Sequence, residues 1–341
     1  MTLTEKLLKW YAKNGRDLPW RVKGRAHDDP YAVWVSEIML QQTTVKTVLP
    51  YFARFMKRFP DVFALASAPL DEVLLYWQGL GYYTRARKMH ECAKTLVDSY
   101  QGRFPADRDE LQKLPGIGAY TSAAILSFGF NLPHAVVDGN VIRVLTRLKG
   151  WASPVSDIQK DIAALAQELT SETRAADYSS AIMDLGATVC TPAHPDCPAC
   201  PWQSDCVAFK QHKTAEIPNI VKPEKTVKKG YVFLISDDKN RFYLRKRTEK
   251  GLLSGLTEFP WNTDESFPFN ADWNVSEKTV KHTFTHFTLL LTLVFLRKND
   301  PPVDLGGRFV AVTDFPSYPF STLMEKVVKK GGLHEKTPVD H

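Results

Sequence analysis

The chain has 341 residues, of which 44% are hydrophobic and 24% are charged, and this composition excludes a disordered, collagen-like or coiled-coil protein while leaving room for about two domains. The longest largely apolar run, residues 288–296, is far shorter than the roughly 18 residues of a membrane helix, and residues 1–10 contain no apolar signal core, so we expect a soluble, cytoplasmic protein without a membrane segment. The net charge of +6 is spread along the chain, which is compatible with nucleic-acid binding but does not identify a partner.

Residues 1–215 predict an all-α domain. Asp29 followed by Pro30 is typical of a helix N-cap with proline in the first turn, and apolar residues repeat at helical spacing after it. Further helices are predicted over 69–77, 82–100, 110–114, 119–128, 157–170 and 178–189, and another after Asp138. No internal repeat interrupts this pattern.

The pattern changes beyond residue 215. Residues 216–230 combine prolines with lysine and glutamate side chains and have little to bury, which indicates a linker. Between 231 and 330 the apolar period becomes two, with strands predicted on both sides of a turn at 237–240 and within 280–297, and a closing helix over 320–330. We expect this second domain to be α+β and residues 331–341 to form a tail.

Four of the five cysteines lie close together in the sequence: Cys190, Cys197, Cys200 and Cys206, spaced C-x6-C-x2-C-x5-C. The prolines between them favour a loop, so four thiolates can converge on one metal centre, whereas disulfides are not expected in a cytoplasmic chain. Structural zinc and an iron–sulfur cubane both use four cysteines, and the spacing leaves both open. The fifth, Cys92, is expected to be buried in a helix.

A short turn, residues 115–118, joins two predicted helices and contains Gly116 and Gly118. The turn is predicted to be too tight for a side chain at either glycine, with positive φ and room for a ligand to approach. Outward-pointing amides at the start of the next helix would favour an anion. An ordinary helical hairpin is the plain alternative, but we expect a helix-hairpin-helix element that contacts DNA phosphates without reading sequence.

Two acidic residues stand in unusual surroundings. Glu37 shares a helical face with apolar residues, so it is either paired with a cation or raised in pKa by burial, as a general acid near neutral pH requires. Asp138 lies between an apolar stretch and a helix, where it can cap the helix and stay ionised. One protonated and one ionised carboxyl group is the combination that cleaves glycosidic bonds.

These motifs resemble the helix-hairpin-helix DNA glycosylases, and more closely their adenine DNA glycosylase (MutY-type) branch, over nearly the whole chain. They stand in the family's order: Leu18-Pro19-Trp20-Arg21, the segment 35–43 with Met-Leu-Gln-Gln-Thr, Gly79-Leu80-Gly81-Tyr82-Tyr83, Leu114 to Gly118, Val137 to Val141 and the four cysteines. The glycine and cysteine motifs also occur in endonuclease III, whereas the Met-Leu-Gln-Gln-Thr segment with Glu37 is far more specific.

The resemblance implies two helical subdomains with the extruded base between them, and a [4Fe–4S] cluster rather than zinc on the four cysteines. Glu37 would protonate adenine N7 and later act as general base, while Asp138 would stabilise or trap the oxocarbenium ion. The remaining implied site residues line the base pocket (Trp20, Arg21, Asn140) or contact DNA, where Gln42 and Tyr82 would enter the base stack (Gln42, Thr43, Leu80, Tyr82, Gly116, Gly118). The implied partner is double-stranded DNA with an adenine:8-oxoguanine or adenine:guanine mispair, bound by a monomer at the bacterial nucleoid.

Position 120 bears on strand cleavage. Bifunctional relatives carry a lysine two residues after the second hairpin glycine, where this chain has Tyr120. A phenol cannot form the Schiff base that strand cleavage requires. The resemblance therefore predicts a monofunctional glycosylase of base excision repair.

The second domain resembles the MutT-like (Nudix) domain that ends adenine glycosylases, through residues 251–260, although Thr257 stands where that family commonly has an aromatic residue. No glutamate-rich helix follows Trp261, so the carboxylates that hold Mg²⁺ in a Nudix hydrolase are missing and we expect recognition only. Phe284-Thr285-His286 matches the family's Phe-Ser-His loop, which implies contact with 8-oxoguanine.

One departure concerns the pocket, since Ser179 and Ser180 stand where the family usually has Asn followed by Gln or Glu. Both are too short for the same contact with adenine, so we expect water, or Glu37 and Arg21, to hold the base. Two alternatives from different classes are an endonuclease III-like bifunctional pyrimidine glycosylase/lyase and a non-catalytic iron–sulfur DNA-binding protein. Tyr120 and the second domain disfavour the first, and Glu37 with Asp138 disfavours the second.

Overall fold

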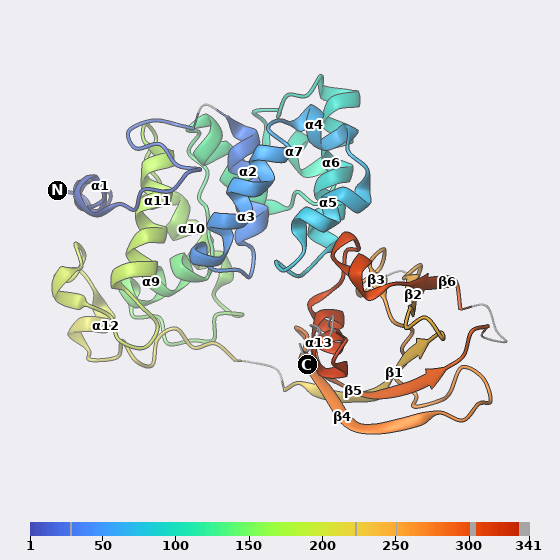
Figure 1. Ribbon diagram of the computed structural model, residues 1–341. Coiled ribbons are helices and arrows are strands. Elements are labelled where there is room, and N and C mark those ends of the chain that lie inside the picture. The colour runs from blue at the N-terminus through green and yellow to red at the C-terminus, as the bar shows by residue number, and fades with distance from the viewer. Residues whose placement is uncertain (28, 222–223, 250, 301–304, 334–341) are drawn as a thin grey trace, which may run out of the picture. The chain divides into compact units, whose positions relative to one another are not determined.

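The computed structural model describes residues 1–27, 29–221, 224–249, 251–300 and 305–333. The chain forms two compact units, Met1–Ser67 with Glu91–Lys222 and Ala68–His90 with Pro223–His341 (Figure 1). In the described ranges no helix is both long and apolar enough to cross a membrane.

The first unit is helical, as the periodicity of its sequence predicts. Among the described residues its helices are α1 (Leu3–Asn14), α2 (Pro30–Leu40), α3 (Val45–Arg58), α4 (Val62–Ser67), α7 (Arg108–Lys113), α8 (Ala119–Ala124), α9 (Gly139–Lys149), α10 (Gln159–Leu169), α11 (Ala175–Asp184) and α12 (Val207–Lys210). Helices α8 and α11 each continue into a π-helical turn, Ile125–Gly129 and Leu185–Val189. Such turns are frequent at functional sites.

Local capping explains where the helices that carry the site begin. The Asp29 side chain accepts a hydrogen bond from the Tyr31 amide at the start of α2, and the Asp138 side chain accepts one from the Val141 amide at the start of α9. Both caps satisfy amides that the helix itself leaves without a partner. The predicted starts of these two helices are therefore confirmed.

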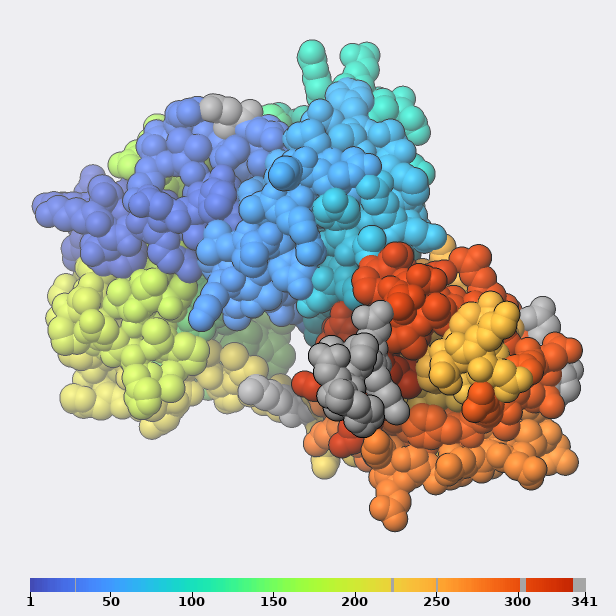
Figure 2. All heavy atoms as spheres, viewed as in Figure 1, coloured from blue at the N-terminus to red at the C-terminus, as the bar shows by residue number. Residues whose placement is uncertain are grey.

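The core of the first unit brings its two sequence ends together. Leu7 and Tyr11 of α1 pack with buried residues of α9, α10 and α11, and with Trp202 beside the cysteines. In Figure 2 the blue N-terminal residues lie against the yellow-green residues of the same unit. The Trp202 indole donates to the Leu3 carbonyl at 2.8 Å, and Lys6 pairs with Asp205 at 2.7 Å. Helix α1 is therefore joined to the cysteine segment by a hydrogen bond and an ion pair.

The second unit is a mixed sheet with helices, as predicted. Its strands and closing helix are β1 (Thr226–Ser236), β2 (Phe242–Lys246), β3 (Thr257–Glu258), β4 (Asn274–Thr283), β5 (Phe287–Arg297), β6 (Gly307–Val310) and α13 (Thr322–Gly331). The order is β3-β2-β1-β5-β4 with β6 also paired to β2, and β1 runs parallel to β5 while the other pairs are antiparallel. Apolar residues of β1 and β5 alternate between two cores, one of them covered by α13 (Figure 1).

Strand β1 begins at Thr226, within the segment 216–230 that its composition predicts as a linker. Residues 226–230 pair in register with 287–291 of β5, so long-range ladder hydrogen bonds order a stretch whose side chains stay mostly exposed. Lys222 and Pro223 lie outside the described residues. The predicted strand region 280–297 is a hairpin, β4 and β5, whose first strand starts earlier, at Asn274.

The second unit also includes Ala68–His90, which the predicted boundary placed in the first domain. This segment contains α5 (Leu70–Trp77) and the start of α6 (Thr84–Tyr100). The Tyr83 hydroxyl donates to the Phe320 carbonyl at 2.8 Å, and the Gln78 amide donates to the Glu325 carboxylate at 2.9 Å. These partners are more than two hundred positions away in the sequence, so no local pattern could indicate the assignment.

Candidate active site

A cleft of about 880 Å³ opens in the first unit. It is lined by Arg16, Leu18, Arg21, Glu37, Leu40, Gln41, Gln42, Thr43, Thr44, Val45, Lys46, Tyr120, Asp138, Gly139, Asn140, Met183 and Ala187. These residues come from α2, α3, α8, α9, α11 with its π-helical turn, and the loops before α2 and between α2 and α3. The fold thus gathers Glu37, Tyr120, Asp138 and Asn140 in one cleft, and also Arg21, Gln42 and Thr43.

Trp20 is placed differently from the expectation that it lines the base pocket. It is buried, and its ring packs edge-on against Phe52 at 5.1 Å rather than lining the cleft. Trp20 and Arg21 are neighbours in a turn closed by the hydrogen bond from the Arg21 amide to the Leu18 carbonyl, but their side chains have different partners. Trp20 packs into the core, while Arg21 lines the cleft.

Glu37 is only 5% exposed and lies on the apolar face of α2. The pKa of this carboxyl group is raised from 4.5 to about 7, mainly by burial; the Tyr120 hydrogen bond and Arg21 lower it in part, and the nearby Asp138 raises it. The Tyr120 hydroxyl donates to Glu37 Oε2 at 2.8 Å. Glu37 is therefore a group that can exchange a proton near neutral pH, as its position in the sequence predicts.

Asp138 is held in an acceptor geometry at the N-terminus of α9. Its Oδ1 accepts from the Val141 amide and its Oδ2 from the Asn140 side chain, each at 2.8 Å. Each carboxylate oxygen therefore has a fixed donor, and the partial positive charge of the helix N-terminus lies beside the carboxylate. The site thus combines the buried carboxyl group of Glu37 with a second carboxyl group fixed at the start of a helix.

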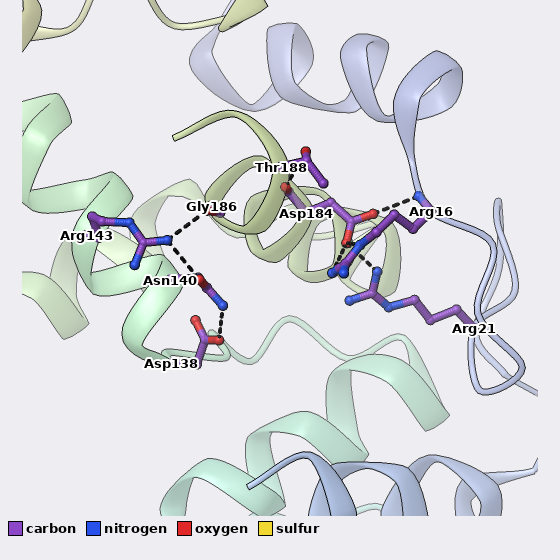
Figure 3. A network of polar contacts seen from close by, with 8 residues as sticks. All are labelled: Arg16, Arg21, Asp138, Asn140, Arg143, Asp184, Gly186 and Thr188. Carbon is purple, nitrogen blue, oxygen red and sulfur yellow. Dashed lines mark hydrogen bonds and ion pairs between the residues drawn. The ribbon is translucent and has the colours of Figure 1, made fainter. Parts of the chain in front are cut away.

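A hydrogen-bond chain leads from Asp138 toward the cysteine segment (Figure 3). Asn140 Oδ1 accepts from an Arg143 Nη2 atom at 2.8 Å, and the same nitrogen donates to the Gly186 carbonyl at 2.7 Å. Arg143 Nε donates to the Cys190 carbonyl at 2.8 Å. Sequence reasoning missed Arg143, although its position four residues after Gly139 places it on the same face of α9.

A second polar group in Figure 3 holds two arginines at the cleft. Asp184 is completely buried and accepts from the Arg16 amide and side chain and from Arg21 Nη1, the last at 2.6 Å. Burial alone would raise the pKa of Asp184, but Arg21 and Arg16 hold it below its ordinary value. No local pattern indicates this anchor, because Asp184 lies more than 160 positions from both arginines.

The four cysteines line one pocket with Arg147. All are free, and the Arg147 guanidinium contacts the Cys190 sulfur at 3.4 Å while donating to the Thr191 and Pro192 carbonyls. In the part of the chain that the structure describes, no three His, Cys, Asp or Glu side chains lie close enough together to hold a single metal ion.

The hairpin turn 115–118 has the predicted place between α7 and α8, but only one of its glycines has the predicted backbone. Gly116 has φ +78°, whereas Gly118 is extended, with φ −98°. A Cβ at Gly118 would meet nothing within 4 Å. The prediction that the turn excludes a side chain at Gly118 is therefore wrong, since this position is open space.

The remaining predicted contacts belong to the second unit. Leu80 is buried and Tyr82 is exposed, in the turn between α5 and α6. Phe284 is half-buried against Phe287, with ring centroids 4.9 Å apart, while Thr285 and His286 are exposed in the turn between β4 and β5. The Thr285 hydroxyl lies 3.4 Å from the Tyr82 hydroxyl.

Both departures from the family pattern lie in buried places. Ser179 and Ser180 are buried in α11, and the Ser179 hydroxyl pairs with that of Ser127 at 2.9 Å instead of facing the cleft. Met183 and Ala187 line the cleft from this side. Thr257 is buried in β3, and residues 262–273, all described, form a loop where a Nudix hydrolase has its metal-binding helix.

Two family models match separate parts of the chain, and the first of them spans Ala68–His90. Residues 35–171 match the family model of the HhH-GPD superfamily base excision DNA repair proteins, and residues 231–330 match that of the NUDIX domain. A helical unit with a cleft that contains two carboxyl groups, a hairpin turn and a cysteine loop, followed in the chain by a Nudix-like unit, defines a DNA glycosylase. The chain belongs to the adenine DNA glycosylases, which are hydrolases acting on N-glycosyl bonds.

The sequence is 38% identical over 301 residues to the adenine DNA glycosylase of Buchnera aphidicola subsp. Baizongia pistaciae, covering 85% of this chain and 84% of the relative. It is 46% identical over 209 residues to the human adenine DNA glycosylase, covering 59% of this chain and 38% of that longer protein. Among solved structures, a thermostable thymine-DNA glycosylase superposes with a TM-score of 0.55 and 27% identity, covering 61% of this chain and 95% of the other.

Proposed function

We propose that this adenine DNA glycosylase is monofunctional and removes adenine mispaired with 8-oxoguanine or guanine. The observation that carries the proposal is the pairing, in one cleft, of a buried Glu37 with a raised pKa and an Asp138 whose two oxygens accept hydrogen bonds. Such a pair supplies a proton to the leaving base and a negative charge to the sugar. A cleft of about 880 Å³ is large enough to enclose an extruded nucleotide.

In the proposed reaction Glu37 donates its proton to adenine N7. The bond between the sugar C1′ and adenine N9 then breaks, its electron pair leaves with the base, and the sugar becomes an oxocarbenium ion that Asp138 stabilises. The ionised Glu37 takes a proton from the attacking water, which completes the abasic product. Arg21, anchored on Asp184 at 2.6 Å, stabilises Glu37 in its ionised stages.

Tyr120 supports the monofunctional assignment. Its hydroxyl donates to Glu37 at 2.8 Å, so the phenol orients the acid. Strand cleavage would need an amine at this place to form a Schiff base with the sugar, and a phenol cannot supply one. The product is therefore an intact strand with an abasic site.

We also propose that Cys190, Cys197, Cys200 and Cys206 hold a [4Fe–4S] cluster. Their spread around one pocket, with Arg147 beside the sulfurs, suits four thiolate ligands and the net negative charge of such a cluster. Bound there, the cluster would cross-link the cysteine segment. Through Arg143, that segment contacts the Asn140 side chain that holds Asp138.

Recognition of the mispair is assigned to residues of both units, most of them at least partly exposed. Gln42, Thr43, Gly116 and Gly118 would contact DNA from the first unit, and Gly118 offers the open backbone that a phosphate needs. In the second unit Leu80 and Tyr82 would contact the duplex. The exposed turn with Phe284, Thr285 and His286 would contact 8-oxoguanine.

The test is product analysis with duplexes that place adenine opposite 8-oxoguanine, guanine, cytosine or thymine. We expect free adenine from the first two, no release by the Glu37→Gln variant, and unchanged release by the exposed control Glu172→Gln. Release of a pyrimidine, or undiminished release by Glu37→Gln, would contradict the proposal.

Strand integrity is checked in the same reactions by quenching them with and without alkali. The strand should remain intact without alkali and break only when alkali cleaves the abasic site. Prompt nicking without alkali would show the bifunctional mechanism instead.

A further inference from the structure

The turn that carries Tyr82 has an unusual backbone. Gly79, Gly81 and Tyr82 have φ values of +99°, +69° and +49°, so the left-handed region is used three times between α5 and α6. For a tyrosine this conformation is unfavourable and persists only if surrounding contacts hold it. Tyr82 is nevertheless 47% exposed, so its own side chain contributes little packing.

Arg85, one turn further along α6, supplies such contacts. Its guanidinium carbon lies 5.4 Å from the Trp77 ring centroid and 5.4 Å from that of Tyr82. Its Nη2 atom lies 3.4 Å from the Leu80 carbonyl and 3.2 Å from the Gly81 carbonyl. One planar side chain therefore contacts both the ring and the backbone of the turn.

Trp77 also contacts this turn and the Arg85 guanidinium. It is fully buried at the end of α5, and its indole nitrogen donates to the Gly81 carbonyl at 3.0 Å. The Gly81 carbonyl thus accepts from both the indole and the guanidinium. Burial lowers the pKa of Arg85 to about 10, which still leaves the group charged at neutral pH.

We propose that Arg85 is a positioning residue that fixes the turn and the Tyr82 ring in the orientation needed to enter the base stack. The inference rests on the proposed function, in which Tyr82 supports extrusion of adenine. It differs from a phosphate contact, because the guanidinium is directed at carbonyls and rings of its own unit rather than outward.

Rigidity of the turn matters because opening the duplex costs a few kcal/mol. A ring that must first be ordered would lose part of its binding free energy to conformational entropy, whereas a preorganised ring does not. Arginine suits this task better than lysine, since its planar group can stack on rings and donate several hydrogen bonds at once. The Thr285 hydroxyl, 3.4 Å from the Tyr82 hydroxyl, borders the ring on another side.

The experiment compares the full-length wild type with Arg85→Gln, Arg85→Lys, Tyr82→Ala and the double variant Tyr82→Ala/Arg85→Gln. Single-turnover adenine release is measured on a fully paired duplex with one adenine:8-oxoguanine mispair, and on the same duplex with mismatched pairs on both sides. Arg87→Gln is the matched control, since it removes the same charge from the same helix but contacts Thr84 rather than the turn. Thermal unfolding of each variant reports on folding.

We expect Arg85→Gln to slow release from the fully paired duplex about tenfold, consistent with the loss of ring contacts and carbonyl hydrogen bonds. Arg85→Lys should fall between it and the wild type, and Arg87→Gln should match the wild type. The deficit should shrink on the pre-opened duplex, where extrusion costs less, and Arg85→Gln should add little in the Tyr82→Ala background. A defect that is merely structural would be the same on both duplexes.

Three results would overturn the inference: wild-type rates in both Arg85 variants, an equal deficit on the two duplexes, or an undiminished effect of Arg85→Gln when Tyr82 is absent. If Arg85→Gln fails to fold, the same comparisons with Arg85→Lys decide the matter. Failure of the wild-type chain to release adenine from any mispair would instead refute the proposed function, and this inference with it.

Discussion

A buried carboxyl group costs free energy whenever it carries a charge, and Glu37 is 5% exposed. Its pKa is raised from 4.5 to about 7 in the folded protein. At a pH between these two pKa values, Glu37 keeps its proton in the folded state but has lost it in the unfolded state. Stability therefore falls as the pH rises through this window, by about 3 kcal/mol in the limit of high pH.

Replacing Glu37 by glutamine removes this penalty. We expect Glu37→Gln to abolish activity yet to stabilise the protein, with an advantage over the wild type that grows by about 2–3 kcal/mol between pH 5 and pH 8. Urea unfolding of both proteins at the two pH values measures it. A stability difference between the two proteins that does not change with pH would mean that the pKa of Glu37 is not raised.

Tyr120 also affects the pKa of Glu37. Its hydrogen bond to Glu37 favours the ionised carboxylate and so lowers the pKa of Glu37. We expect Tyr120→Phe to raise that pKa further and to move the alkaline limb of the pH–rate profile upward by about half a unit or more. Single-turnover adenine release between pH 5 and pH 9 would reveal it. A limb displaced to lower pH would contradict the assignment of Tyr120 as the donor.

Helix α9 connects the catalytic and cysteine regions through side chains on one face. Near its start Asp138 caps the helix and Arg143 reaches the Cys190 carbonyl, while near its end the buried Arg147 donates to the Thr191, Pro192 and Ile217 carbonyls. Asp138 and the cysteine segment are therefore held by the same rigid element. A disturbance of the cysteine segment should reach the catalytic carboxylate through this helix.

Arg147 offers a direct test of this helix as a support. Arg147→Met removes the donors of three carbonyl groups, that of Ile217 buried and those of Thr191 and Pro192 part-buried, and we expect a loss of about 3 kcal/mol of unfolding free energy. Lys149→Met, exposed in the last turn of the same helix, should cost little. Urea unfolding at neutral pH compares the two, and equal losses would mean that the carbonyl contacts of Arg147 do not matter.

Across the whole chain, the segment Ala68–His90 is built into the second unit although it lies early in the sequence. Two kinds of contact hold it, the buried hydrogen bond from Tyr83 to the Phe320 carbonyl and the exposed ion pair of Lys246 with Asp71. A buried hydrogen bond contributes more to the free energy of unfolding than an exposed ion pair does. The segment that carries Tyr82 therefore depends on residues near the C-terminus.

This difference can be measured. Tyr83→Phe should cost about 1–2 kcal/mol of unfolding free energy, whereas Lys246→Ala should cost less than about 1 kcal/mol and should respond to salt. Denaturant unfolding in low and high salt distinguishes them. A larger loss for Lys246→Ala would mean that surface charge, rather than the buried contact, holds the segment.

Features that depend on neighbours a few positions apart were predictable. The caps at Asp29 and Asp138, the helical periodicity, the cysteine spacing and the apolar surroundings of Glu37 all arise within one or two turns of chain, where sequence spacing fixes geometry. The same spacing marks Glu37 as unusual but leaves open whether it is paired with a cation or raised in pKa. The family of the protein, and the roles expected of its site residues, came from the resemblance to the adenine DNA glycosylases.

Other features depend on which distant segments pack together, and these required the fold. The donor to Glu37 lies 83 positions away, Asp184 anchors two arginines from the other end of the first unit, and β1 pairs in parallel with a strand far along the chain. Even Gly118 was misjudged, because the space around a residue is set by what the rest of the chain leaves empty. Spacing along a chain fixes local conformation, whereas burial and partners are set by long-range packing.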